Sequence, residues 1–123
     1  MSRVLLIEPD ESLAAAIAKY LDKNGHHTVV CHDAQGAIAE SDKTKPDIVV
    51  MELAIPKNNG LAFLQEFRSY TDWISIPAIV YSCISREDAG LTDSQWQKQG
   101  VEAYLYKPTK TLADLLTNIE NIA

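Results

Sequence analysis

The sequence predicts an α/β fold in which helices cover both faces of a parallel, doubly wound sheet. Five short apolar runs alternate along the chain with longer segments of helical period, and this alternation is typical of such a sheet. Short runs rich in Val, Ile and Leu suit strands that are buried on both faces. The predicted strands are Val4–Ile7, Thr28–Cys31, Ile48–Met51, Ala78–Tyr81 and Ala103–Tyr106.

Four of five expected helices are predicted from a capping residue followed by apolar residues at helical spacing. The most amphipathic is the last, which begins with a capping box from Thr111 to Asp114 and continues with Leu and Ile on one side. The second, over residues 34–41, has only a thin apolar stripe. The caps that open these four helices are Asp10, Asp33, Asn59 and Thr111.

The fourth helix is predicted to be short or irregular. Gly90 interrupts the segment from Arg86 to Gln99, and a second capping box, Thr92 to Gln95, lies inside that segment. Glycine destabilises the middle of a helix, whereas a capping box marks the start of one. We therefore expect a loop, followed by a helix from about Asp93 to Gln99.

Composition narrows the functions that the chain can have. Its 123 residues, 46% of them hydrophobic, suffice for one buried core, so the sequence predicts a single domain over residues 1–123. The formal charge of −6 argues against binding to nucleic acid or anionic membranes, because neither offers charge of the opposite sign. Apolar runs are too short for a membrane span, and Met-Ser-Arg followed at once by the apolar run Val4–Ile7 is too short for a signal peptide. We therefore expect a cytoplasmic protein whose partners are other proteins.

Charged and polar residues directly follow four of the predicted strands. Glu8-Pro9-Asp10 follows the first, Glu52 the third, Ser82 the fourth and Lys107-Pro108 the fifth. The carboxyl ends of parallel strands share one edge of a sheet, and ligands of doubly wound sheets bind there. Acids that hold a hard cation, a carboxylate nucleophile, and a hydroxyl and an ammonium for the phosphate oxygens are the groups that cation-assisted phosphoryl transfer needs.

Four blocks of sequence surround these residues: Leu5–Leu13, Lys45–Pro56 followed by Gly60, Ile76–Ser82, and Ala103–Pro108. In this order and spacing they resemble the receiver domains of response regulators, from about residue 3 to residue 121. Each block alone is common among α/β proteins, but together they are specific. The resemblance implies a flavodoxin-like, CheY-like fold with strand order 2-1-3-4-5 and five helices.

The resemblance also implies roles for the acids at the strand ends. Glu8 matches the family's first metal-coordinating acid, Pro9 falls where the family often has a second, and Glu52 falls at the phosphoacceptor position, which is normally Asp. One carboxylate is thus missing and the acceptor side chain is one methylene longer. Small displacements in such sites lower rates strongly, and Mg²⁺ demands near-ideal octahedral geometry. We therefore expect a pseudo-receiver with weak or absent magnesium binding, no other cofactor, no enzymatic activity and no useful phosphoryl transfer to Glu52.

Three further residues match family positions. Ser82 matches the Ser or Thr that contacts the phosphoryl group, Lys107 matches the lysine, and Tyr104 matches the switch aromatic whose rotamer reports the active state. The peptide bond between Lys107 and Pro108 resembles one that is frequently cis in the family.

Without a metal ion, we expect Lys107 to form an ion pair with Glu52, Glu8 or both. Asp10 is next to this degenerate phosphoacceptor pocket, but we expect its side chain to cap the first helix. The sequence leaves open whether Glu52 imitates a phosphorylated aspartate. Inward positions of Ser82 and Tyr104 would favour that imitation, and an outward Tyr104 would count against it.

The leading hypothesis is a receiver-like signalling module of a two-component or phosphorelay system that acts by protein–protein interaction without phosphorylation. The resemblance implies a contact surface formed by the fourth helix, the fifth strand and the last helix, and allows a homodimer through it. The partner would be a signalling kinase, an output domain or another regulator. One alternative is a receiver phosphorylated at Glu52 or Asp10, with slow autodephosphorylation. Another, ranked last, is a flavodoxin-like domain for a small anion or nucleotide, since Glu8-Pro9-Asp10 would repel phosphate.

Overall fold

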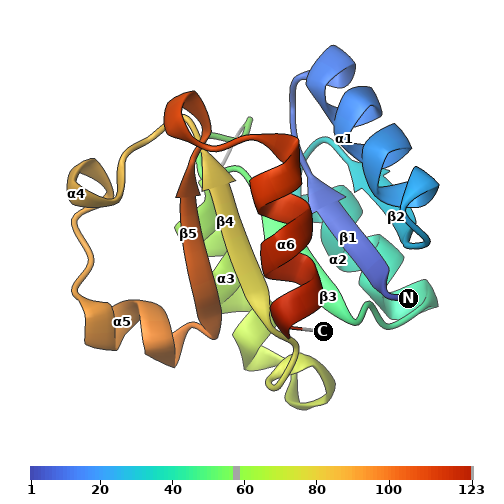
Figure 1. Cartoon of the computed structure of the whole chain (residues 1–123). Coiled ribbons are helices and arrows are strands. Elements are labelled where there is room, and N and C mark those ends of the chain that lie inside the picture. Colours follow the sequence, from blue (N-terminus) through green and yellow to red (C-terminus); the bar gives the residue numbers. More distant parts are fainter. Residues whose placement is uncertain (57–58, 123) are drawn as a thin grey trace.

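The computed structural model describes residues 1–56 and 59–122 as a five-stranded sheet with connecting helices (Figure 1). The strands are β1 Arg3–Ile7, β2 His27–Cys31, β3 Ile48–Met51, β4 Ala78–Ser82 and β5 Val101–Tyr106. The α-helices are α1 Glu11–Lys23, α2 Ala34–Lys43, α3 Gly60–Ser69, α4 Arg86–Ala89, α5 Asp93–Lys98 and α6 Leu112–Ile122. Two short 3-10 helices, η1 Thr71–Trp73 and η2 Lys107–Thr109, follow α3 and β5.

All five strands are parallel, in the predicted order β2-β1-β3-β4-β5. Four of the predicted strands agree with the structure to within one residue at each end. The exception is β5, which begins two residues earlier than predicted, at Val101. The exposed Glu102 lies there at an irregularity in the pairing with β4, because Ala78 pairs with Val101 and Ile79 with Ala103. This charged residue interrupts the apolar run, so the start of the strand could not be recognised from the apolar pattern.

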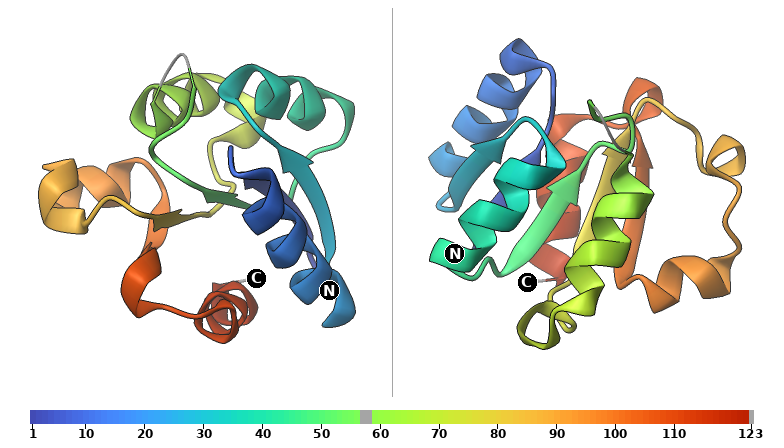
Figure 2. Two further views of the ribbon diagram at one scale, coloured as in Figure 1. Left: turned by 90° about the horizontal axis from the view of Figure 1, so that it is seen from above. Right: turned by 180° about the vertical axis from the view of Figure 1, so that it is seen from behind.

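Helices cover both faces of the sheet, with α1 and α6 on one side and α2 and α3 on the other (Figure 2). Successive strand side chains point to opposite faces. Accordingly, Val4 and Leu6 pack in a core with α1 and α6, whereas Leu5 and Ile7 pack in a second core with α2 and α3. Burial on both faces is the physical reason why the central strands have continuous apolar runs.

The segment predicted as one irregular helix forms two helices, so the described residues contain six α-helices and not five. The expectation of a loop before Asp93 was wrong over α4. Ser85 caps α4 by accepting a hydrogen bond from the N–H of Asp88, and Gly90 ends it with a left-handed φ of 80°. None of the four residues of α4 is fully buried, although Ala89 packs against the core, and Trp96 is the one buried residue of α5.

The predicted caps position the remaining helices. The carboxylates of Asp10 and Asp33 and the amide oxygen of Asn59 each accept a backbone N–H at the start of a helix. The capping boxes at Thr92 and Thr111 both form. Within residues 1–56 and 59–122, no helix has the length and apolarity needed to cross a membrane.

Candidate functional site

Two buried carboxylates lie side by side where β1 and β3 end. Ile7 pairs with Met51 in the sheet, and the N–H of Glu52 donates to the carbonyl of Ile7 at 3.0 Å. The next residues, Glu8 and Glu52, therefore reach the same edge, with exposures of only 2% and 3%. The pairing of two central strands brings together acids that are 44 residues apart in the sequence.

Lys107 lies between these two acids. It directly follows β5, and its Nζ donates to Glu8 Oε1 at 2.6 Å and to Glu52 Oε1 at 2.8 Å. Both expected ion pairs therefore form. Burial opposes the charge on the ammonium, but the hydrogen bonds and charges of the two acids outweigh burial and raise the pKa of Lys107.

Four donors surround the carboxylate of Glu52. Oε1 accepts from Lys107 Nζ and from the N–H of Cys83, and Oε2 accepts from Ser82 Oγ and from the N–H of Ala54. Burial alone would raise the pKa of this group, but the four hydrogen bonds lower the pKa to about 2. Glu52 is therefore ionised throughout the physiological pH range, and its acceptor positions are filled by groups of the chain itself.

The side chain of Asp10 points out of this cluster. Its Oδ1 accepts the N–H of Leu13 at 3.0 Å as the cap of α1, as expected from the sequence. Only the backbone of Asp10 takes part, because its N–H donates to Glu8 Oε2 at 3.1 Å. Of the five residues predicted to form the pocket, Glu8, Glu52, Ser82 and Lys107 converge there through their side chains.

A chain of hydrogen bonds leads from Glu52 toward β5 and α5. Ser82 Oγ donates to Glu52 and accepts the N–H of Ile84 at 3.0 Å. The hydroxyl of the half-buried Tyr104 in turn donates to the carbonyl of Ile84 at 2.6 Å, and its ring packs edge-on against Trp96, with centroids 5.2 Å apart. Burial and the charge of Glu52 raise the pKa of Tyr104 to about 12, so the hydroxyl stays protonated as a donor.

The sequence-based expectation was wrong for one feature of the site and missed another. The peptide bond between Lys107 and Pro108 is trans, since none of the described peptide bonds is cis, so the resemblance to a cis peptide does not hold. The N–H donors of Cys83 and Ala54 were not predicted. They belong to the backbone, and residue type carries no signal for their direction.

Comparison with protein families decides which class of protein uses this arrangement. Residues 4–120 match the response regulator receiver domain. This chain belongs to that family. The receiver domain thus occupies nearly all of the chain, and the four converging residues lie at the strand ends that the resemblance indicated.

Three curated proteins resemble this receiver domain in sequence. Protein PilH of Pseudomonas aeruginosa is 28% identical over 109 residues, which cover 88% of this chain and 87% of PilH. Sensory transduction protein RegX3 of Mycobacterium tuberculosis is 31% identical over 108 residues, covering 88% of this chain and 45% of RegX3. KdpE of Escherichia coli, a transcriptional regulatory protein, is 26% identical over 108 residues, again 45% of its length. The chain therefore spans most of PilH but less than half of RegX3 and KdpE.

Solved structures of receiver domains have the same fold. The chemotaxis protein CheY4 of Vibrio cholerae has a TM-score of 0.86 and 19% identity, covering 100% of this chain and 99% of that chain. The receiver domain of the Francisella response regulator 1452 has a TM-score of 0.83 and 24% identity, covering 99% and 96% of the two chains. At these identities the likeness establishes the fold alone.

Proposed function

We propose that this receiver domain is a cytoplasmic signalling module that works by protein contact and without phosphorylation at residue 52. The observation that carries the proposal is the saturation of Glu52, whose two oxygens already accept from four donors. A nucleophilic oxygen needs a free lone pair, and attack on a phosphoryl donor would require Glu52 to give up at least one of these bonds. The activity of the domain is then the binding of partners, without enzymatic turnover.

The residues present do not fit the magnesium ion that the family implies. The ammonium of Lys107 bridges Glu8 and Glu52, so one oxygen of each acid already binds a positive charge. Pro9 has no carboxylate, and the carboxylate of Asp10 caps α1. Mg²⁺ dehydrates reluctantly and needs near-ideal octahedral geometry, so displacing a hydrogen-bonded ammonium to bind it is unfavourable. This supports weak or absent magnesium binding.

The contacts of Glu52 also support the idea that its carboxylate takes the place of a phosphoryl group. The two side chains that the family resemblance assigns to phosphoryl contact, Ser82 and Lys107, both donate to Glu52. Ser82 is fully buried, and the hydroxyl of Tyr104 is directed to the carbonyl of Ile84, two residues beyond Ser82. These inward positions favour a domain held in one signalling state, which partners recognise through the surface around α4, α5, β5 and α6.

The decisive experiment is incubation with Mg²⁺ and acetyl phosphate, followed by the intact mass of the native protein. We expect no adduct of about 80 Da, the mass of a phosphoryl group. The double variant Pro9→Asp/Glu52→Asp restores the family's acids at both positions and is the matched control, in which an adduct is expected. An adduct on the native protein would contradict the proposal. Mapping it to Glu52 or Asp10 would then establish the alternative, a receiver phosphorylated at a non-standard acid.

A further inference from the structure

Tyr81 is a buried aromatic residue that contacts the ammonium of Lys107. It precedes Ser82 in β4, and successive strand residues face opposite sides of the sheet. Ser82 therefore reaches Glu52, whereas Tyr81 packs in the core with α1 and α6. Tyr81 is only 5% exposed, and Lys107 Nζ lies 5.9 Å from the centroid of its ring. This distance is within the range of a cation–π contact, so the ammonium has an aromatic neighbour in addition to the two acids.

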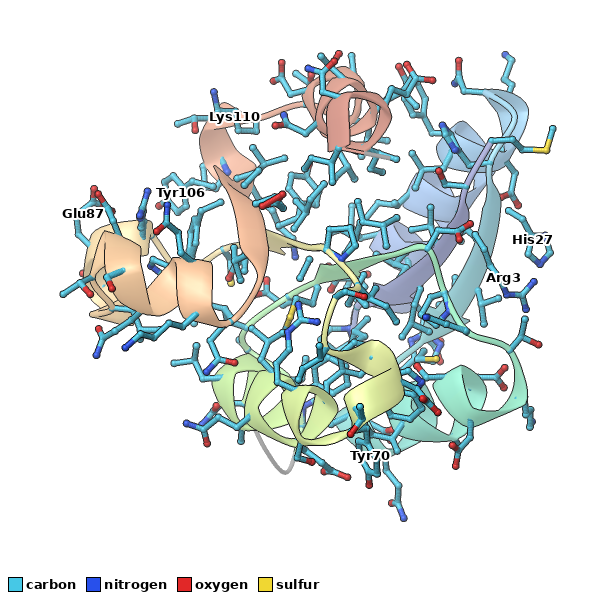
Figure 3. The ribbon with its side chains drawn as sticks, turned by 90° about the horizontal axis from the view of Figure 1, so that it is seen from below. Arg3, His27, Tyr70, Glu87, Tyr106 and Lys110 are labelled. Atoms are coloured by element: carbon cyan, nitrogen blue, oxygen red, sulfur yellow. The ribbon has the colours of Figure 1, made fainter. Side chains whose placement is uncertain are left out.

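The hydroxyl of Tyr81 holds the turn on which Lys107 lies. It donates to the carbonyl of Lys110 at 3.2 Å. The N–H of Lys110 donates in turn to the carbonyls of Tyr106 and Lys107, at 3.1 and 3.3 Å, and so closes η2. Figure 3 shows Lys110 on the segment that leads from β5 to α6, with its side chain pointing away from the body of the protein. Tyr81 thus contacts both the charged end of the Lys107 side chain and the backbone turn from which that side chain extends.

The chemistry of Tyr81 differs from that of its neighbours in the core. Within the described part of the chain, the other buried residues of this core are Val, Leu, Ile or Ala. Burial raises the pKa of Tyr81, so its hydroxyl keeps the proton that it donates to Lys110. An aliphatic residue could fill the same space but could make neither of the two polar contacts. The ring and the hydroxyl therefore indicate a role beyond packing.

The position of Lys107 decides whether Glu8 and Glu52 are available to a cation. A lysine ammonium is a strongly hydrated charge on a flexible stem, and the Lys107 side chain is 16% exposed, so water can reach it. An ammonium that turned toward water would leave two adjacent carboxylates, which are ligands that divalent cations prefer. A contact made only in the bridged arrangement, such as the one with the ring of Tyr81, shifts the equilibrium toward that arrangement.

We propose that Tyr81 is a positioning residue that holds Lys107 between Glu8 and Glu52 and thereby keeps divalent cations out of the site. The ring acts on the ammonium directly, and the hydroxyl acts on the turn that begins at Lys107. The inference deepens the proposed function and rests on it, because it names the residue that maintains the bridged arrangement.

The first test measures proton exchange at the ammonium of Lys107 by NMR on the isotope-labelled full-length chain. In the native protein this exchange should be slow, because the ammonium is hydrogen-bonded and largely buried. Tyr81→Phe removes the hydroxyl and keeps the ring, whereas Tyr81→Leu removes both. Exchange should be faster by about threefold in Tyr81→Phe and by about tenfold in Tyr81→Leu, as expected for the loss of one and of two weak contacts. Fast exchange already in the native protein would overturn the proposal.

The second test is a titration of the same proteins with Mg²⁺ alone, without a phosphoryl donor. The N–H of Cys83 donates to Glu52 Oε1 at 3.0 Å, so its NMR signal reports on cation binding at the acids. A site that is open in only a fraction of the molecules binds its ligand more weakly by that fraction. The apparent dissociation constant should therefore fall by about threefold in Tyr81→Phe and by about tenfold in Tyr81→Leu.

Tyr20→Leu is the matched control for a general loss of packing. Tyr20 lies on α1 and packs against the same core. Within the described chain, it is not among the contacts of the Lys107 ammonium. Tyr20→Leu should therefore lower stability but leave both the exchange at Lys107 and the affinity for Mg²⁺ as in the native protein. Equal effects of Tyr20→Leu and Tyr81→Leu, or native values in both Tyr81 variants, would overturn the proposal.

The two proposals fail separately. A phosphoryl adduct on the native protein, together with faster exchange at Lys107 in the Tyr81 variants, would remove the proposed function and keep the positioning of Lys107. Absence of an adduct, together with native values in both Tyr81 variants, would remove only the role of Tyr81.

Discussion

The molecule contains two clusters in which a cation binds carboxylates, one of them buried and the other exposed. In the first, Lys107 binds Glu8 and Glu52, and the exposures of these side chains are 16%, 3% and 3%. In the second, Arg86 binds Asp93, and their side chains are 43% and 90% exposed. The chemical groups are alike, a cation and carboxylates in hydrogen-bonding contact, but their surroundings differ.

The difference in burial determines what each cluster can do. Little water reaches the charges around Lys107, so removing one partner would leave an uncompensated charge in a medium of low polarity. The pair at Arg86 has water as an alternative partner at all times. The first cluster is therefore suited to hold a fixed arrangement, and the second to exchange its partner.

The largest expected effect comes from removing the buried cation. Lys107→Met leaves two carboxylates without their shared ammonium and should lower the free energy of unfolding by about 3–5 kcal/mol. Urea denaturation at neutral pH measures this loss. Arg86→Met makes the same substitution of a long cationic side chain at the exposed pair, and should change stability by less than about 0.5 kcal/mol. Similar losses in the two variants would show that burial does not distinguish the clusters.

The next largest expected effect is the loss of folding stability at acidic pH. The pKa of Glu52 is about 2 in the folded protein, against an ordinary value of 4.5. The folded state thus binds fewer protons than the unfolded state between these values, and the stabilisation, about 3 kcal/mol, is complete above pH 4.5 and lost as the pH falls toward 2.

Urea denaturation at a series of acidic pH values measures this dependence. Glu52→Gln, which cannot titrate, should lose correspondingly less stability over the same range than the native protein. Glu102→Gln, at an exposed carboxylate, is the matched control and should follow the native protein. A native-like slope in Glu52→Gln would assign the pH dependence to other acids.

The smallest expected effect concerns the break between α4 and α5. Gly90 has a φ of 80°, and a Cβ added there would meet no atom within 4 Å. Gly90→Ala should therefore cost about 1 kcal/mol for conformational reasons alone. Gly90→Asn, which tolerates this region better, should cost less, and thermal unfolding compares the two. Equal losses would mean that the cost does not arise from the left-handed backbone.

Local patterns were sufficient to predict most of the fold. Strands could be recognised because a residue buried on both faces must be apolar, and helix starts because a capping oxygen must precede the first turn. The same reasoning placed Asp10, Asp33 and Thr111 correctly. It failed at α4 and at Glu102, where short or irregular elements have too few residues to set a period.

Sequence order and residue type also predicted which groups meet at the site, because parallel strands bring their carboxyl ends to one edge. They left open whether Lys107 would bind one acid or both, and they did not predict that the N–H groups of Cys83 and Ala54 would complete the shell of Glu52. Strand ends can be placed from local periodicity, whereas the direction of each backbone N–H and the burial of each charge depend on segments far apart in the chain. The pairing of β1, β3, β4 and β5 is what turns four separate residues into one charge-balanced pocket.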